Sequence, residues 1–308
     1  MKIAIMGSGG VGGYFGARLV KGGAEVHFVA RGAHLAAMRE HGLAVEGGPE
    51  PIHVPKVQVT DDPSTIGPVD LVMFCVKLRD TESAARALVP IIKPGTGVVS
   101  FQNGVTKDDI LRPILGEAAL MGGVAYVGTS IGRPGVIAQT GPLQRLVFGE
   151  YDGTRSRRAE DFLAACKAGG INAELSDDVR RSLWEKYVVL AAMSGATTTM
   201  RATIGPIRSN PLSRAFLIDL AREVLAVGRA LGVNLPADFV DQRIPFFDGW
   251  PPEMTTSMHH DLQHGRPLEV RWLSGGVVDL GVKAGVPTPL NRAVRDILIL
   301  HAEGGGPE

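Results

Sequence analysis

A strand that runs straight into a glycine-rich turn near the start of the chain constrains the fold most. The apolar run Lys2–Met6 precedes GSGGVGG, in which Gly7, Gly9 and Gly12 fit G-x-G-x-x-G, and the amphipathic stretch Gly12–Lys21 follows. In this pattern the first glycine makes a tight turn, the second lets a pyrophosphate approach the backbone, and the third allows close helix–strand packing. N–H groups at the helix start then face the phosphates. The sequence predicts a dinucleotide-binding unit, with a plain βα turn as the alternative.

The rest of the N-terminal half alternates short β-branched runs with helical patterns up to about residue 150. Such alternation is typical of a parallel sheet covered by helices on both faces. Further strands are expected at Glu25–Ala30, Asp70–Val76, Gly97–Phe101 and Leu120–Tyr126. The segment Gly135–Gly149 is expected to form an antiparallel hairpin at a sheet edge.

From about Asp177 the strand pattern stops and long helical patterns follow. Helices are expected at Arg180–Ser194, Pro211–Leu231, Thr255–Gln263, Leu268–Ala284 and from Pro289 to about Leu300. The 308 residues exceed one domain of about 150 residues. We therefore expect an α/β protein with a dinucleotide-binding, Rossmann-type parallel sheet domain over residues 1–177 and an all-helical substrate and catalytic domain over residues 178–308.

The end of the second expected strand indicates which dinucleotide is bound. An NAD enzyme of this type places Asp or Glu about 20 residues after the glycines, where it binds the ribose 2′-hydroxyl. Here the strand reads EVHFVARG, so Ala30 and Arg31 stand at that point and no acid is in reach. A guanidinium there can bind a 2′-phosphate. The sequence favours NADP, with a solvated strand-end charge as the alternative for Arg31.

Two further polar residues follow expected strands, at the edge where ligands bind in open α/β sheets. Lys77 follows LVMFCV, and Asn103 follows VVSF within FQNGV. Asn-Gly is also a turn signal in its own right, and a lysine there also suits a surface helix start. The shared position favours cofactor binding by both. The glycine turn completes the candidate cofactor set with Gly7, Ser8, Gly9, Gly10, Val11 and Gly12.

A lysine lies within a largely apolar helical run of the C-terminal half, SLWEKYVVLAAMSGATTT. Burial and the positive end of the helix dipole would both lower the pKa of Lys186, which suits a group that gives up a proton at neutral pH. Leu190 and Ser194 follow at i+4 and i+8 and share its face. The alternative is a buried stem whose ammonium reaches water.

Charge and composition indicate which partners to expect. Lys plus Arg and Asp plus Glu both number 32, so no overall field attracts nucleic acid or a membrane. The sequence has no charged leader and no apolar span of about 20 residues. His260 and His264 are i, i+4, but the Glu of H-E-x-x-H is missing, so no metal site is expected. Cys75 and Cys166 lie in apolar runs, which is typical of buried thiols in the cytoplasm. The sequence does not decide whether the chain forms a homodimer.

Motifs along nearly the whole chain resemble the ketopantoate reductase (2-dehydropantoate 2-reductase) family. In order, they are MKIAIMGSGGVGGYFG, CVK, FQNGV, LWEKYVVLAA, TTSMHHDLQHGRPLEVRWLSGGVVDLG and AGVPTPLN. The LWxKY-type helix and the S-M…G-R-x-x-E block are the most specific. The resemblance implies a Rossmann domain, a helical domain, and NADPH-dependent reduction of a small 2-oxo acid to a 2-hydroxy acid in pantothenate biosynthesis.

The same resemblance implies roles for individual residues. Lys186 matches the family's proton donor, and Glu269 in PLEVRW matches a glutamate near the cofactor ribose and the lysine. Ser257 in TTSM matches a serine that contacts the substrate carboxylate. Asn103 matches an asparagine shared by cofactor and substrate, and Gly128 matches a backbone contact to the cofactor.

Three positions depart from the family pattern. Members that reduce ketopantoate carry asparagines where Leu190, Ser194 and Ile204 stand. Without amides to bind the substrate's hydroxyl and carboxylate, discrimination for ketopantoate weakens, so a less polar pocket is expected. Two alternatives stay open: a paralogous hydroxy-acid dehydrogenase with a less polar substrate, and a non-catalytic NADP(H) sensor, which would need no pair of Lys186 and Glu269.

Overall fold

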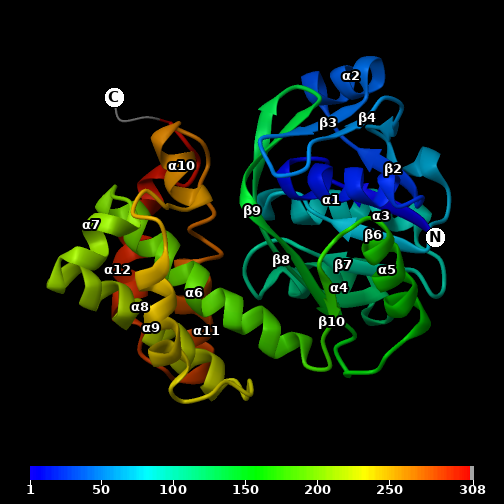
Figure 1. Cartoon of the computed structure of the whole chain (residues 1–308). Coiled ribbons are helices and arrows are strands. Elements are labelled where there is room, and N and C mark those ends of the chain that lie inside the picture. The colour runs from blue at the N-terminus through cyan, green and yellow to red at the C-terminus, as the bar shows by residue number, and fades with distance from the viewer. Residues whose placement is uncertain (306–308) are drawn as a thin grey trace. The chain divides into compact units, whose positions relative to one another are not determined.

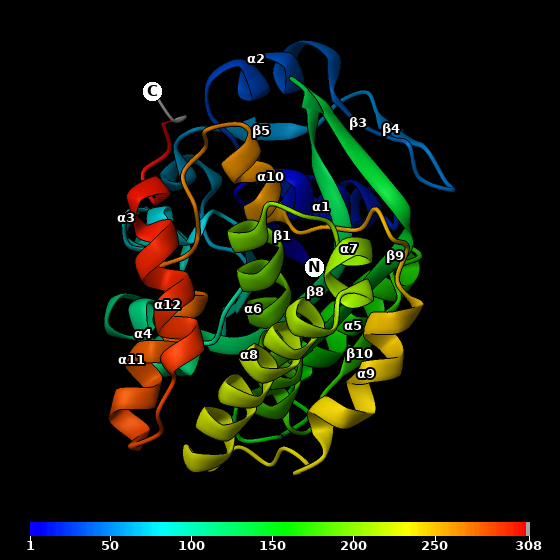
Figure 2. The same ribbon diagram turned by 90° about the vertical axis from the view of Figure 1, so that its left-hand side faces the viewer.

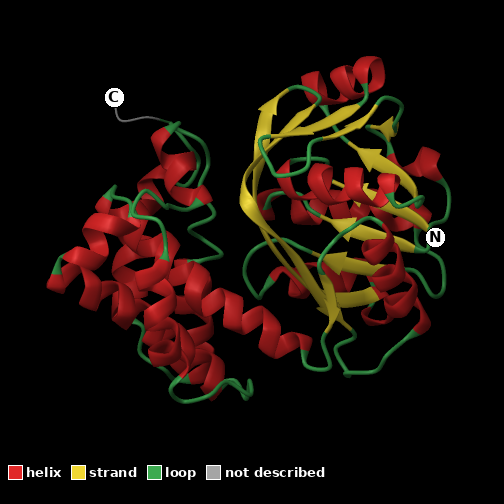
Figure 3. Cartoon of the chain, viewed as in Figure 1, coloured by secondary structure: helices red, strands yellow, loops and turns green. Residues whose placement is uncertain are grey.

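The computed structural model describes residues 1–305 and places the strands and the long C-terminal helices in different compact units (Figure 3). The first unit comprises Met1–Gln102 and Lys107–Ser182, and the second comprises Asn103–Thr106 and the chain from Leu183 onward. The expected fold class, a parallel sheet domain followed by a helical one, is confirmed. The expected boundaries, 1–177 and 178–308, stay a prediction, and residues 306–308 lie outside the described part.

One sheet forms the centre of the first unit (Figure 1). Its strands are β1 (Lys2–Met6), β2 (Glu25–Val29), β3 (Leu43–Glu46), β4 (Ile52–Val54), β5 (Gln58–Thr60), β6 (Leu71–Phe74), β7 (Gly97–Ser100), β8 (Leu120–Arg133), β9 (Val136–Gly149) and β10 (Ala173–Leu175). Their order is β4-β3-β9-β8-β7-β6-β1-β2-β5, and β10 pairs with β9. Only β8–β9 and β3–β4 are antiparallel pairs among the described strands.

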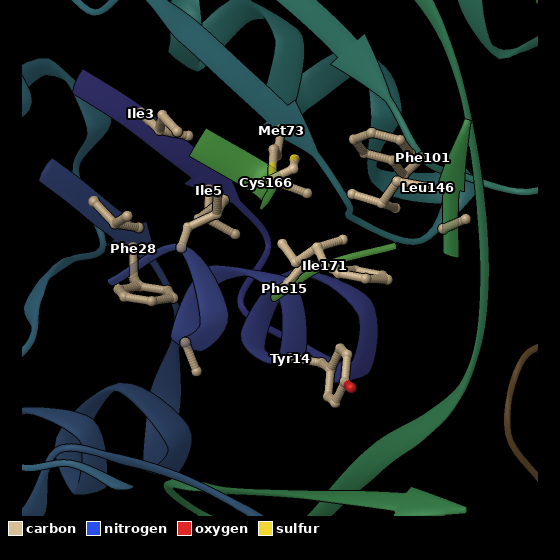
Figure 4. Packing of buried hydrophobic residues seen from close by; sticks show 14 of the residues in the cluster. Ile3, Ile5, Tyr14, Phe15, Phe28, Met73, Phe101, Leu146, Cys166 and Ile171 are labelled. Carbon is tan, nitrogen blue, oxygen red and sulfur yellow. The ribbon is translucent and has the colours of Figure 1, made fainter. Parts of the chain in front are cut away.

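Helices cover both faces of this sheet, and β1 shows why they must. They are α1 (Gly10–Lys21), α2 (Gly32–His41), α3 (Thr81–Leu88), α4 (Lys107–Leu115) and α5 (Arg157–Ala168). Ile3 and Ile5 point into one core cluster, with Phe15 of α1, while Ala4 and Met6 point into another. Figure 4 shows Ile5 and Phe15 among the side chains of the first cluster. Successive side chains alternate between faces, so a strand that is apolar throughout needs cover on both.

The expected hairpin within Gly135–Gly149 is wrong, because this segment is a single strand. As β9 it pairs antiparallel with β8 and has β3 on its other side, so it does not lie at an edge. The register with β8 shifts between Val127 and Thr129. Gly141, at φ +70°, and Pro142, which has no N–H, fit this irregularity. The residues that signal a turn in the sequence therefore form a bulge.

The second unit is built from helices packed around α8 (Figure 2). The helices are α6 (Val179–Met200), which begins in the first unit, α7 (Ile204–Ser209), α8 (Pro211–Ala230), α9 (Phe239–Gly249), α10 (Ser257–Gln263), α11 (Ser274–Ala284) and α12 (Pro289–Leu298). α8 contacts α7, α9, α11 and α12. The residues at the start of α8 determine where the helix begins. The Asn210 side chain accepts hydrogen bonds from the N–H groups of Leu212 and Ser213, and Pro211 stands in the first turn.

One helix of this unit is shorter than expected. The predicted helix Leu268–Ala284 begins only at Ser274, because the carbonyl of Glu269 accepts N–H groups from Trp272 and Leu273 in a tight turn before it. Glu269 therefore lies in a turn and not at a helix start. In the described part of the chain, no helix combines the length and the apolar character needed to cross a membrane.

Candidate active site

Four strands of the first unit end in one row, at the carboxyl edge of the sheet. Met6 pairs with Val29 and with Phe74, and Phe74 pairs with Ser100. The chain passes from β1 to β2 on one side and returns to β6 on the other, which makes this edge a topological switch point, where ligands bind in such sheets. Three of the candidate cofactor residues lie just after the ends of these strands: Gly7, Arg31 and Lys77.

The glycine turn has the geometry that a pyrophosphate needs. Gly7 has φ +96°, and a Cβ on Gly12 would lie 2.2 Å from the Gly7 carbonyl oxygen, so only glycine allows α1 to approach so closely. A Cβ on Gly9 would meet nothing within 4 Å. Gly9 caps α1 without a side-chain hydrogen bond, so the first N–H groups of the helix are left for a ligand. The turn therefore fits a dinucleotide.

Strand β8 passes directly beside the start of α1. A Cβ on Gly10 would lie 2.5 Å from the carbonyl oxygen of Thr129. Gly128, the preceding residue, is exposed and lies at the irregularity between β8 and β9. The structure thus brings the residue that follows Gly128 next to the glycine turn, and the role of Gly128 at the cofactor stays a prediction.

His34, on α2, is a residue that sequence reasoning missed. Its Nδ1 accepts the N–H of Gly135 at 3.0 Å, so Nε2 carries the proton and donates to the Ser8 carbonyl at 2.9 Å. The neutral ring therefore holds the glycine turn against the loop between β8 and β9. Burial lowers the pKa of His34 from its ordinary value of 6.5. No local motif marks this histidine, because its partners lie far along the chain.

Replacing His34 with glutamine is expected to reduce the loss of stability in acid. Since folding lowers the pKa, the neutral ring's contribution is complete above the unfolded value and is lost as the pH falls through the folded value. Urea unfolding from pH 7.5 to pH 5 (about one unit above the ordinary pKa to 1.5 below it) measures the effect. The free energy of unfolding should fall less in His34→Gln than in wild type or in the exposed control His41→Gln; equal slopes would contradict this account.

Three of the predicted site residues form a hydrogen-bonded row in the second unit. Lys186 Nζ donates to Asn103 Oδ1 at 3.1 Å, and Asn103 Nδ2 donates to Glu269 Oε2 at 3.4 Å. Lys186 and Asn103 are half-buried, and Glu269 is 8% exposed. The ammonium on one side and the carboxylate on the other fix the orientation of the amide. An ammonium, an amide and a carboxylate in a row can hold and deliver a proton.

The neighbour of Lys186 ties α6 to the turn that carries Glu269. The Tyr187 hydroxyl donates to the backbone carbonyls of Leu273 at 2.7 Å and Trp272 at 3.1 Å. Tyr187 is buried, and burial raises its pKa above the ordinary value, so it remains a donor. Lys186 itself lies two turns into α6, where the helix dipole has largely faded. The influence of the dipole that the sequence led us to expect is therefore small at this position.

The remaining candidate substrate residues differ in their distance from this row. Leu190 is half-buried one turn after Lys186, and Ser194 is fully buried, with no hydrogen-bond partner for its Oγ within residues 1–305. Ser257, exposed at the start of α10, follows Thr256, whose hydroxyl pairs with that of Thr197. Ser257 therefore lies near the far end of α6. Ile204 is not brought to the row either, because it is fully buried in the helical core.

Comparison with known proteins shows similarity over nearly the whole chain. The family models "Ketopantoate reductase PanE/ApbA" and "Ketopantoate reductase PanE/ApbA C terminal" match residues 3–153 and 178–302. A 2-dehydropantoate 2-reductase of Mesorhizobium japonicum is 31% identical, over 96% of this chain and 95% of its own. A PanE/ApbA family ketopantoate reductase from Ralstonia eutropha JMP134 superposes with TM-score 0.89 and 34% identity, over 98% of both chains. For the 2-dehydropantoate 2-reductase from Geobacter metallireducens GS-15 the TM-score is 0.91 and the identity 28%, over 97% of this chain and 99% of that one.

Proposed function

The chain belongs to the ketopantoate reductase family of oxidoreductases, and on that premise we propose that it reduces a 2-oxo acid to a 2-hydroxy acid with NADPH. The observation that carries the proposal is the row of Lys186, Asn103 and Glu269. A carbonyl reduction needs one hydride and one proton, and this row is suited to supply the proton. NADPH, when bound, supplies the hydride and leaves as NADP⁺.

Lys186 is the proposed proton donor and Glu269 its proposed catalytic partner. The ammonium would protonate the carbonyl oxygen of the substrate as negative charge develops on it. Asn103 Oδ1 accepts one of the three ammonium N–H groups and so fixes the direction in which Nζ points. Glu269 accepts a hydrogen bond from the other end of the amide and so fixes the side of Asn103 that faces Lys186.

The first unit supplies most of the proposed cofactor contacts. The glycine turn would bind the pyrophosphate through its N–H groups, and Arg31 would bind the 2′-phosphate of NADPH. Arg31 is exposed just after β2, as that role requires. The complete proposed set is Gly7, Ser8, Gly9, Gly10, Val11, Gly12, Arg31, Lys77, Asn103, Gly128 and Glu269.

The side chains after Lys186 favour a substrate less polar than ketopantoate, as a paralogous hydroxy-acid dehydrogenase would use. The half-buried Leu190 presents an apolar group one turn from Lys186. Ser194 offers one small hydroxyl, without a partner within residues 1–305, where the family's ketopantoate reductases have an amide. An apolar substrate chain loses nothing at Leu190, whereas a substrate hydroxyl there would lose its hydrogen bond.

A panel of 2-oxo acids tests this proposal. We expect NADPH oxidation, followed by absorbance, with kcat/KM about tenfold higher for branched apolar 2-oxo acids than for ketopantoate. Leu190→Asn should reverse part of this preference, whereas the matched control Leu190→Ala, which removes the apolar side chain without adding an amide, should not raise activity on ketopantoate. Tight NADPH binding without turnover on any member would overturn the proposal and support an NADP(H) sensor.

We also propose that the protein is cytoplasmic and that it forms a homodimer. Cys75 and Cys166 are both free thiols, and burial raises the pKa of Cys75 to about 12, as expected for unreactive cysteines in a reducing compartment. Val282 on α11 and Ile297 on α12 are exposed apolar side chains that a second copy could cover. Light scattering on the purified protein measures the oligomeric state.

A further inference from the structure

Lys107, the first residue of α4, has a side chain with no exposure to solvent. Its Nζ donates hydrogen bonds to the backbone carbonyls of Ser100, Gln102 at 2.9 Å and Gly123 at 2.8 Å. These three bonds use all the N–H groups of an ammonium. Nothing in the proposed chemistry uses this lysine, and the polar sequence KDDIL around it is typical of a solvated helix start.

This ammonium is not buried to complete an ion pair. The side chain of Asp108, the adjacent acid, accepts the hydroxyl of Tyr151, and burial raises the pKa of Asp108. Lys107 forms no ion pair within residues 1–305. A buried charge is costly unless its hydrogen bonds are complete, and here they are completed by main-chain oxygens alone. The hydrogen bonds from Lys107 therefore restrict the positions of these three backbone oxygens.

The side chain of Gln102 reinforces the same loop. Its Oε1 accepts the hydroxyl of Ser100 at 3.0 Å, and its Nε2 donates to the Val76 carbonyl at 3.0 Å and to the Thr81 hydroxyl at 2.8 Å. Both the oxygen and the nitrogen of the Gln102 side-chain amide are thus fixed by hydrogen bonds. The segment that follows β7 is therefore held by Val76 just after β6, by Thr81 at the start of α3 and by Gly123 in β8.

The peptide bond fixed in this way carries the next residue, Asn103. The carbonyl of Gln102 and the N–H of Asn103 lie in one plane, so a hydrogen bond to that carbonyl restricts the direction in which the Asn103 side chain leaves the backbone. That side chain contacts Lys186 and Glu269. Gly104 follows with φ +82°, which turns the chain immediately afterwards.

We propose that Lys107 is a positioning residue for the proton-transfer site, acting by holding the peptide between Gln102 and Asn103 so that the Asn103 amide meets the ammonium of Lys186. The inference rests on the proposed function, in which Lys186 delivers the proton. Burial lowers the pKa of Lys107 to about 8, so at neutral pH the ammonium form, with all three donors, still predominates.

A double-mutant cycle on the full chain tests the proposal. Lys107→Met and Asn103→Ala are measured singly and together, at saturating NADPH, with the best 2-oxo acid of the panel. We expect Lys107→Met to lower kcat about tenfold with little change in KM for NADPH, because misplaced catalytic groups slow chemistry more than cofactor binding. In the Asn103→Ala background the same change should alter kcat less than about twofold, since the residue through which Lys107 acts is then gone.

A matched control separates positioning from general loss of stability. Arg18 is another buried cation of the first unit, bonded to Tyr14 and Gly170 and remote from the Asn103 loop in its contacts. Arg18→Met should lower Tm but leave kcat of the folded enzyme unchanged. If Lys107→Met does not fold, Lys107→Gln, which keeps two N–H donors, takes its place in the cycle and should lower kcat less.

The outcomes distinguish the inference from the function on which it rests. Equal fold-losses from Lys107→Met with and without Asn103 would overturn the positioning role alone. An unchanged kcat in Lys107→Met, with Asn103→Ala impaired, would do the same. Unchanged turnover in Asn103→Ala itself would instead contradict the proposed proton-transfer row, whatever Lys107 does.

Discussion

Replacing Lys186 with alanine is expected to lower kcat about 10²–10⁴-fold, the usual contribution of a general acid, while NADPH still binds. The variant loses the ammonium that donates a hydrogen bond to Asn103 Oδ1, so water must protonate the developing alkoxide. Most proposed cofactor contacts lie in the first unit and are untouched by the change. Stopped-flow absorbance gives the turnover, and NADPH fluorescence titration gives the Kd.

Two comparisons sharpen this result. Lys283→Ala removes an exposed lysine from α11 and should leave kcat unchanged. Small primary amines added to Lys186→Ala should restore part of the rate, because they can donate the missing proton. Turnover of Lys186→Ala close to that of wild type would show that another group donates the proton.

Replacing Arg31 with alanine is expected to reduce the preference for NADPH over NADH about 10- to 100-fold, the loss associated with one or two hydrogen bonds to a charged group. Arg31 stands at the N-terminal end of α2, exposed to solvent, and its side chain makes no hydrogen bond or ion pair within residues 1–305. Its guanidinium therefore has no structural task in this part of the chain. The measured quantity is the ratio of kcat/KM for the two cofactors.

The effect should be confined to the 2′-phosphate. KM for NADPH should rise in Arg31→Ala, and the kinetics with NADH should stay as in wild type. Arg39→Ala provides a control on the same helix, since Arg39 pairs with Asp61 on the surface. An unchanged cofactor ratio in Arg31→Ala would remove the proposed role of Arg31 and with it the argument for NADP.

Local signals explain which parts of the fold could be predicted. Strand Lys2–Met6 and the helix after it were found from the sequence because the glycine turn between them depends on its own residues. The turn signal at Gly141 and Pro142 was misleading, because positive φ and a missing N–H suit a bulge as well as a hairpin turn. Only the neighbouring strands β3 and β8 decide between the two.

Local signals also identified part of the candidate site. Residues whose partners lie far along the chain were missed. Lys186 stands out in an apolar helix, and Asn103 stands directly after a strand, so both can be found in the sequence. Lys107 cannot, because its burial is created by carbonyls of Ser100, Gln102 and Gly123 that come together only on folding. His34 was missed because its partners lie in the glycine turn and in the loop between β8 and β9.

The short segment Asn103–Thr106 belongs to the helical unit although the chain on both sides belongs to the sheet unit. A gene cut at the apparent junction before Leu183 would therefore encode a C-terminal half without Asn103. Exchange of halves between relatives would likewise join the lysine and glutamate of one parent to the asparagine and the buried Lys107 of the other. A cut at this junction would therefore separate Asn103, the central amide of the proposed proton-transfer row, from Lys186 and Glu269.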